Sequence, residues 1–329
     1  MNKQKSALPA RLQKALHHGD RPWLILQIVM GLAVLALLVT IGIMLWQQSA
    51  DARTEFGLGF FLPTSNPSWD PVNDNFQSWP FIYGTLITSL VALAVALPFS
   101  LGIAIFLAEL CPAWLRAPLG TLIELLAAIP SVVYGLWGIF VFLPVLVAPF
   151  GKFLGSSLGQ VPGVQIFFNG IMSASGSSRL GAAMILAVMI TPTIASVSRD
   201  VLMAIPADQR EAAFGLGATP WETISQILLP YGASGILGAV ILGLGRALGE
   251  TMAVTMVIGN SVDNTLSLLR PGYTMSSIIA NEFAEAVNPL HSQALIEVAL
   301  LLFVITLLLN GGARFLLWRV AKNNPTGGR

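Results

Sequence analysis

Six long apolar runs constrain the fold of this chain more than any other feature of its sequence. They lie near residues 23–46, 81–108, 122–148, 180–198, 231–259 and 294–318. A helix needs about 20 mostly apolar residues to cross the hydrocarbon core of a bilayer. Lipid offers no hydrogen-bond partners to the backbone, so a single apolar segment crosses it as a helix. The sequence therefore predicts an all-α polytopic membrane protein with about six transmembrane helices.

The composition agrees with this class and excludes several others. Charged residues make up 10% of the chain and hydrophobic residues 55%, whereas soluble domains carry about 25% charged residues. A net charge of +1 argues against nucleic acid as a partner. The single cysteine, Cys111, excludes an internal disulfide. The three histidines show no metal-ligand spacing, so we expect no metal and no other cofactor.

The lysines and arginines indicate the orientation. Twelve of the 17 lie in the terminal tails or in loops on the same side as the tails, and four lie on the opposite side. By the positive-inside rule, residues 1–22 and 319–329 are then cytoplasmic tails. The first run, 23–46, is expected to be an N-terminal transmembrane helix, because its apolar core exceeds the roughly 7–15 residues of a signal peptide. Three loops then face the outside: 47–80, 149–179 and 260–293.

A polar segment between the fourth and fifth runs carries a spaced motif. Its residues are Glu211, Ala212, Ala213, Gly217, Ile227, Leu229 and Pro230, in the spacing EAA-x3-G-x9-I-x-LP. We expect Pro230 to mark the join with the next transmembrane helix. The segment as a whole is predicted to form a helix, a glycine turn and a second helix.

Local sequence signals support this helix–turn–helix prediction. Residues 208–216 can form the first helix, and Gly217 suits the left-handed cap that ends one. Thr219 is a good N-cap for the second helix, and Pro220 falls at its first position. Glu222 lies where a capping box requires a carboxylate.

The seven motif positions resemble the EAA loop of bacterial ABC importer permeases, here at about residues 199–230. The resemblance implies a cytoplasmic loop that docks in a groove of an ATPase subunit. The partner would then hydrolyse the ATP, and this chain would be a non-catalytic permease subunit. An ordinary polar loop with helical pieces is the alternative.

Two charged residues lie inside the fifth apolar run. Arg246 and Glu250 are four residues apart, which would place them on one face of a helix. A charge in hydrocarbon is costly and normally faces a bundle interior or a water-filled path. The planar guanidinium of arginine can hold phosphate oxygens in a bidentate manner. We therefore expect both residues on the path of an anionic substrate; a structural ion pair between two helices is the alternative.

Further segments resemble phosphate ABC importer permeases. Residues 245–255 (GRALGETMAVT) and 129–135 (IPSVVYG) are similar to signatures in the fifth and third spans of that family. Residues 69–71 (WDP) and 80–85 (PFIYGT) resemble its PstC-like subunits rather than its PstA-like subunits. The resemblance extends over about residues 56–318.

This resemblance implies a type I ABC importer transmembrane domain. The permease core would cover residues 81–318, and the N-terminal helix would pack against a neighbouring permease. The expected partners are a PstA-like permease subunit in a heterodimer, a dimer of PstB-like ATPases and a periplasmic phosphate-binding protein. The importer would move inorganic phosphate from the periplasm to the cytoplasm across the bacterial inner membrane, with Arg246 and Glu250 on the translocation path.

Other functions stay open at this point. An ABC importer for another oxyanion, such as sulfate, molybdate or phosphonate, would share the motif. An ion-coupled secondary phosphate transporter would show internal repeats with broken helices, and no repeat is evident. An intramembrane enzyme would bring Ser, His and carboxylate residues together in the spans, which the sequence does not suggest. Glu297, in the sixth run, and the N-terminal tail have no assigned role.

Overall fold

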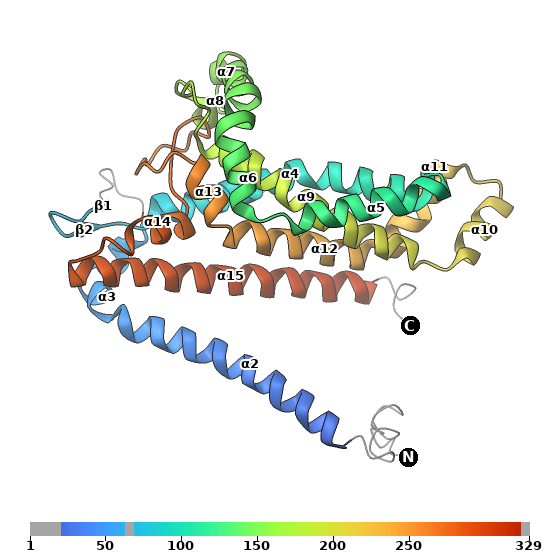
Figure 1. Cartoon of the computed structure of the whole chain (residues 1–329), viewed down its shortest axis with the longest axis horizontal. Helices are drawn as coiled ribbons and strands as arrows, with labels where there is room; N and C mark the ends of the chain where they lie inside the picture. The colour runs from blue at the N-terminus through green and yellow to red at the C-terminus, as the bar shows by residue number, and fades with distance from the viewer. Residues whose placement is uncertain (1–20, 63–68, 324–329) are drawn as a thin grey trace.

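The computed structural model describes residues 21–62 and 69–323 of the chain (Figure 1). Within these residues, six helices are long and apolar enough to cross a membrane: Trp23–Gln48, Trp79–Leu110, Ser131–Gln160, Arg179–Met203, Pro220–Gly249 and Pro289–Phe315. The predicted polytopic helical fold is confirmed, with one short β-hairpin added to it. Most of the two predicted tails, 1–22 and 319–329, lies outside the described residues.

The elements follow one another in a simple order. The first are α2 (Arg21–Gln48), α3 (Ala50–Phe56), the 3-10 turn η1 (Gly57–Phe60), the antiparallel strands β1 (Trp69–Asp70) and β2 (Asn75–Phe76), and α4 (Trp79–Ile105). Next come the π-helical η2 (Phe106–Leu110), α5 (Ala113–Ala128), α6 (Ser131–Trp137), the π-helical η3 (Gly138–Val147), α7 (Ala148–Ser157), the 3-10 turn η4 (Leu158–Gln160) and α8 (Gln165–Phe168). The last are α9 (Arg179–Met203), α10 (Ala207–Gly215), α11 (Pro220–Glu222), the π-helical η5 (Thr223–Leu228), α12 (Leu229–Gly249), α13 (Met252–Val257), α14 (Met275–Glu282) and α15 (Pro289–Asn323).

Helix α9 lies at the centre of the bundle. It packs along α4, and α5 and α12 also contact it (Figure 1). Ala92 and Ala96 of α4 and Ile190 and Ile194 of α9 are wholly buried in the main core. Small residues let membrane helices approach closely, so the alanines of α4 explain its tight packing.

The third predicted span, 122–148, is wrong as a single helix. Helix α5 ends at Ala128, and a second helix begins at Ser131. Pro130 has no N–H and disfavours a helical conformation in the residue before it. Ile129 is accordingly extended, with ψ 131°. The apolar run continues through this break, so composition alone could not locate it.

The fifth predicted span, 231–259, also has different ends. The helix begins at Pro220, where α11, η5 and α12 are continuous, and it ends at Gly249. Pro230 lies in the first turn of α12, where the π-helical η5 gives way to α-helix, so the predicted join is a change of helix type within one continuous helix. The π-helical η5 precedes it and changes the hydrogen-bond register just before the missing N–H. Helices match the other four predicted spans, with ends shifted by a few residues.

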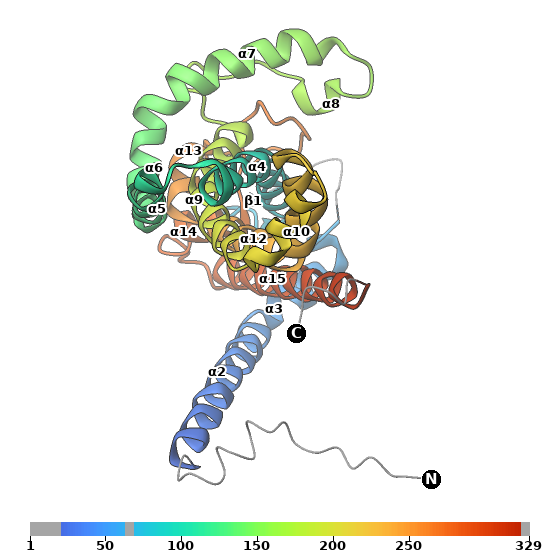
Figure 2. The same cartoon turned by 90° about the vertical axis from the view of Figure 1, so that its right-hand side faces the viewer.

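The first helix, α2, diverges from the bundle (Figures 1 and 2). Its large apolar side chains are exposed, and it meets the rest of the chain near α3 and α15. At that join, Arg53 Nη1 lies 3.4 Å from Glu297 Oε2, and only 3% of the Glu297 side chain is exposed. Arg53 also covers the ring of Trp46. Glu297, which has no role from sequence alone, thus fastens α3 to α15.

The two ends of the bundle differ. The β1–β2 hairpin and α14 lie at one end, and α10 and α11 lie at the other (Figure 1). At the hairpin end, Trp69 packs on Phe76 and Phe81 and donates to Glu282 Oε2 at 2.6 Å. Helix α2 begins and α15 ends on the side that carries α10. The described chain therefore begins and ends on the same side as the spaced motif, although α2 joins the bundle at the opposite end.

Candidate functional site

The first four positions of the spaced motif, from Glu211 to Gly217, lie at the end of α10 and in the turn that joins it to α11. Ala218 N donates to the carbonyl of Ala213 at 3.1 Å, and Gly217 N donates to the carbonyl of Phe214 at 3.0 Å. This pair of hydrogen bonds is a Schellman motif, which needs a left-handed residue just after the helix. Gly217 has φ +86° and supplies that conformation. The predicted glycine cap is confirmed.

The second helix of the turn begins as the sequence predicts. Thr219 Oγ1 accepts from the backbone N–H of Glu222, and the Glu222 carboxylate accepts from the backbone N–H of Thr219 at 2.8 Å. Pro220 occupies the first helical position. The first helix covers Ala207–Gly215, close to the predicted 208–216. The predicted helix, glycine turn and second helix are therefore confirmed.

The turn presents both charged and apolar side chains. Glu211 and Ala212 are exposed, whereas Ala213 is buried. Three large apolar side chains that sequence reasoning did not single out are also exposed: Phe214 (50%), Leu216 (91%) and Trp221 (66%). Large apolar side chains exposed together mark interaction surfaces. Their signal in the sequence was apolar residues interrupting an otherwise polar loop.

The last three motif positions lie in the helix that follows the turn. Ile227 and Leu229 are half-buried, and Pro230 is exposed. Leu229 packs against a buried cluster at this end of the bundle, and none of the three residues is part of the exposed turn.

The two signature segments meet in the interior of the protein. Helix α6 starts after the break at Pro130, and α13 packs directly against it. A Cβ added to Gly135 would lie 3.2 Å from Ala253 Cα and 2.6 Å from Met256 Sδ. A side chain at this position would require Met256 to move and the two backbones to separate slightly, so glycine favours the close approach. Segments 129–135 and 245–255 therefore form one structural unit.

Glu250 is the residue just beyond the end of α12, so the prediction that one helix carries both Arg246 and Glu250 is wrong. Helix α12 ends at Gly249, and Glu250 is extended, with φ −69° and ψ 126°. Its Oε1 accepts from the backbone N–H of Ala253 at 3.1 Å, at the start of α13. The first amides of a helix lack intrahelical partners, and a side-chain oxygen satisfies one of them here. Ser276 Oγ donates to the Glu250 carbonyl at 2.8 Å and fixes the same break.

Arg246 lies in the last turn of α12 and is half-buried. Its Nη1 donates to Thr193 Oγ1 of α9 at 3.0 Å and to the carbonyl of Ala127 at 3.3 Å. Ala127 is in the last turn of α5, where carbonyls lack intrahelical partners and a cation is favoured. Sequence reasoning missed Thr193 because nothing local distinguishes it from other hydroxyls of α9.

The charge of Arg246 is not neutralised by Glu250. Across the described residues, Arg246 forms no ion pair, and its Nε and Nη2 have no hydrogen-bond partner. The alternative of a structural ion pair between Arg246 and Glu250 is therefore wrong for this conformation. Two nitrogens of one edge of the guanidinium are left for another acceptor, which is the geometry of bidentate oxyanion binding.

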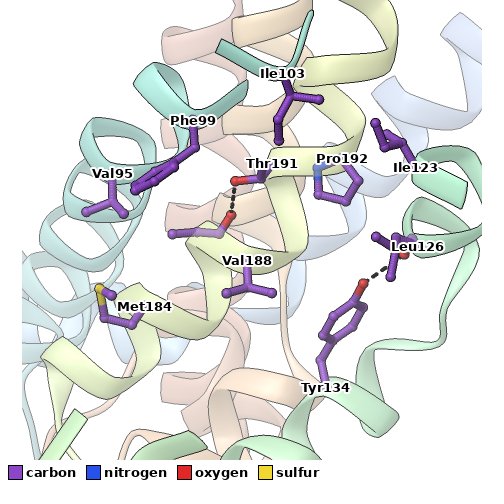
Figure 3. A pocket seen from close by; sticks show the side chains of 11 residues that line it. Val95, Phe99, Ile103, Ile123, Leu126, Tyr134, Met184, Val188, Thr191 and Pro192 are labelled. Atoms are coloured by element: carbon purple, nitrogen blue, oxygen red, sulfur yellow. Dashed lines mark hydrogen bonds between the residues drawn. The ribbon is translucent and has the colours of Figure 1, made fainter. Parts of the chain in front are cut away.

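An apolar cavity of about 400 Å³ lies beside this unit, between α4, α5, α6 and α9 (Figure 3). The hydroxyls in its wall already have partners. Thr191 Oγ1 donates to the carbonyl of Ala187 at 2.7 Å, and Tyr134 Oη donates to the carbonyl of Leu126 at 2.8 Å. A cavity of this kind does not suit an oxyanion, because a buried charge needs polar partners. Within residues 21–62 and 69–323, no group of three or more His, Cys, Asp or Glu side chains could hold a metal ion.

Comparison with known proteins identifies relatives over most of the chain. Residues 100–322 match the family described as binding-protein-dependent transport system inner membrane component. The phosphate transport system permease protein PstC of Mesorhizobium japonicum is 45% identical over 290 residues, which cover 88% of this chain and 87% of the relative. The protein of the same name from Haemophilus influenzae is 48% identical over 276 residues, with coverages of 84% and 86%.

The fold also has a counterpart among solved structures. The MetNI methionine ABC transporter, in an inward facing conformation, matches with a TM-score of 0.51 and 18% identity, covering 72% of this chain and 93% of the other. At that identity the likeness concerns the fold alone. It confirms the predicted fold of a type I ABC importer transmembrane domain.

Proposed function

Because the chain belongs to the family of binding-protein-dependent transport system inner membrane components, we propose that it is the permease subunit of an ATP-driven importer of inorganic phosphate. The likeness to PstC permeases carries this proposal, since it extends over 88% of the chain at 45% identity. The motif turn and both signature segments lie within the residues that match the family.

Arg246 is the residue that meets phosphate in this proposal. Its unpartnered Nε and Nη2 can bind two oxygens of the anion in a fork, while Nη1 stays attached to Thr193. Glu250 contributes differently, because it shapes the break between α12 and α13. Irregular backbone at membrane depth is tolerated where it is buried in protein or lines a cavity. The break beside Arg246 is therefore a suitable wall for a translocation path.

The exposed turn between α10 and α11 is the docking element for an ATPase in this proposal. Glu211 and Ala212 face solvent there, beside the apolar side chains of Phe214, Leu216 and Trp221. An apolar patch with a charged rim is typical of a protein interface. The chain itself then hydrolyses no ATP, and it receives its movement from the partner.

The complete importer would contain a PstA-like permease subunit, a dimer of PstB-like ATPases and a periplasmic phosphate-binding protein. The exposed apolar surface of α2 is available to lipid and to the second permease. We place the chain in the bacterial inner membrane with both termini in the cytoplasm. This orientation is supported by Figure 1, in which the start of α2 and the end of α15 lie on the same side as the α10–α11 turn.

An importer for another oxyanion is the second candidate, because sulfate, molybdate and phosphonate also offer oxygens to an arginine. Uptake of labelled phosphate, measured in cells that lack this subunit and in the same cells complemented with it, tests the proposal. We expect uptake only in the complemented cells, with little competition from excess sulfate, molybdate or phosphonate. If one of these anions competes with labelled phosphate as strongly as unlabelled phosphate does, the permease would be assigned to that anion.

A further inference from the structure

Arg210, the residue just before the EAA positions, is bound on every side. Its Nε lies 3.1 and 3.2 Å from the two carboxylate oxygens of Glu109, and its Nη2 lies 2.7 Å from Glu109 Oε1. Nη1 donates to the carbonyl of Ile205 at 2.7 Å, and Nη2 also donates to the carbonyl of Leu202 at 2.8 Å. All three guanidinium nitrogens of Arg210 are therefore in use.

The partners of Arg210 lie at the ends of the two central helices. Glu109 is in η2, the π-helical turn that ends α4, and such turns often mark functional positions. Leu202 is in the last turn of α9 and Ile205 follows it, at a helix end where carbonyls lack the usual i+4 amide partner. Arg210 thus ties α10 to the ends of both α4 and α9. We refer to Arg210 and Glu109, with these two carbonyls, as the clamp.

The clamp is shielded from solvent. The side chains of Arg210 and Glu109 are 21% and 15% exposed. A partly buried ion pair of this kind contributes little net stability, since desolvation offsets the attraction. Its two-pronged geometry does fix the relative orientation of the elements that it joins. The neighbouring Glu211 and Ala212 are exposed and free to meet another protein.

A continuous path leads from the clamp to the anion site. Helix α9 carries Thr193, which holds Arg246 at 3.0 Å, and α9 packs along α4. A displacement of α10 that is transmitted to the end of α9 would therefore reach the guanidinium through one rigid helix. Energetic coupling between distant sites is carried by packed side chains, hydrogen-bond networks and rigid elements of this kind.

We propose that Arg210 is a positioning residue that transmits movement of the ATPase-docking helix α10, through Glu109 and the end of α9, to the Arg246 site. This inference rests on the proposed function in that α10 docks the ATPase. Arg210 itself contacts neither the ATPase nor the anion. Its loss should uncouple ATP hydrolysis from transport and leave assembly intact.

The test uses the complete importer in proteoliposomes, with its binding protein and ATP, and compares Arg210→Gln, Glu109→Gln and the double variant. We expect the ATPase to co-purify with all three and to hydrolyse ATP. The amount of anion moved per ATP hydrolysed should fall about 2- to 30-fold, the effect of losing one residue on a coupling path of this kind. The ratio in the double variant should fall no further than in either single variant, because each single substitution already removes the clamp. Glu124→Gln is the matched control, since it breaks the 2.9 Å Arg199–Glu124 ion pair on α5 and α9 without touching α10.

Several results would overturn the clamp. One is an unchanged anion-to-ATP ratio in Arg210→Gln. Another is a double variant whose ratio falls by the product of the two single losses. A third is an ATPase that co-purifies with Glu109→Gln but no longer with Arg210→Gln. Should Arg210→Gln fail to fold, Arg210→Lys keeps the charge without the fork and should give a partial loss of the ratio; a wild-type ratio there overturns the clamp too. A wild-type complex that moves sulfate instead of phosphate would refute the proposed substrate, and the same ratio would then be measured with sulfate.

Discussion

The guanidinium of Arg246 is held by Thr193, a hydroxyl residue on another helix, with 3.0 Å between Nη1 and Oγ1. Glu250, the nearest acidic residue in sequence, instead caps the first turn of α13. The arginine therefore keeps its positive charge without a carboxylate partner, while a hydroxyl and a helix-end carbonyl orient it. Thr193 and the Ala127 carbonyl fix the position of the guanidinium, and neither group carries a negative charge. An arginine held in this way can bind an anion without first breaking an ion pair.

Arg246→Gln should abolish phosphate uptake, and adding Glu250→Gln should not restore it. The reason is that Arg246 and Glu250 form no ion pair, so the loss in Arg246→Gln does not come from an unpaired Glu250 carboxylate that Glu250→Gln could remove. Arg246→Lys should be partly active, because an ammonium cannot reproduce the bidentate fork. Labelled phosphate uptake, normalised to the amount of permease in the membrane, measures all three. Near-wild-type uptake by the double variant would show that Arg246 is a structural residue.

Gly135→Ala should destabilise the unit formed by the two signature segments. The added Cβ would meet the backbone of Ala253 at 3.2 Å, and overpacking of this kind costs about 1–3 kcal/mol. Gly102→Ala is the matched control, because a Cβ there meets nothing within 4 Å; it should be neutral or slightly stabilising. Melting temperatures of the two purified variants provide the comparison. Equal melting temperatures would mean that the close approach at Gly135 is not required.

The features that could be predicted from the sequence are those set by neighbouring residues. The Thr219–Glu222 capping box and the glycine cap at Gly217 each depend on a few consecutive residues. Four of the six spans were equally predictable, since their length and apolar character are properties of a single segment. The family signatures singled out two segments without showing how they are arranged.

The errors concern features that depend on residues far apart in the chain. The break after Gly249 is stabilised by the Glu250 cap and by Ser276 of α14, so the apolar run through residue 259 gave no sign of it. The partners of Arg246 come from α5 and α9, which no spacing rule could identify. The ion pair between Arg53 and Glu297 is equally non-local.

Gly217→Ala should weaken the association with the ATPase. A left-handed backbone costs a residue with a Cβ roughly 1–2 kcal/mol, which corresponds to a loss of about 5- to 30-fold in the population of the native turn. Gly215→Ala changes a glycine of the same turn that is helical and has open space around it, and it should bind normally. Co-purification of the ATPase and phosphate uptake both report the difference. If the ATPase co-purifies equally with the two variants, docking does not depend on the left-handed conformation at Gly217.

Thiol labelling can establish the orientation of the chain. In a Cys111→Ser background, Val287→Cys (94% exposed) lies at the hairpin end and Leu216→Cys (91% exposed) lies in the motif turn. The 12-to-4 distribution of basic residues predicts that the motif turn lies inside the cell. An impermeant thiol reagent added to intact cells lacking the ATPase should label only Val287→Cys, and permeabilised cells should label both. Labelling of Leu216→Cys alone in intact cells would reverse the assignment.

Arg53→Ala should destabilise the join between α3 and α15. It leaves the Glu297 carboxylate, 3% exposed, without its cation, and breaking a buried ion pair on one side costs about 3–5 kcal/mol. The double variant Arg53→Ala/Glu297→Gln removes the buried charge and should recover most of the lost melting temperature. Asp51→Asn is the control, because the contact of Asp51 with Gln293 at the same join is exposed and contributes little. If the double variant is as unstable as Arg53→Ala, the stacking of Arg53 on Trp46, and not the ion pair, holds α2 to the bundle.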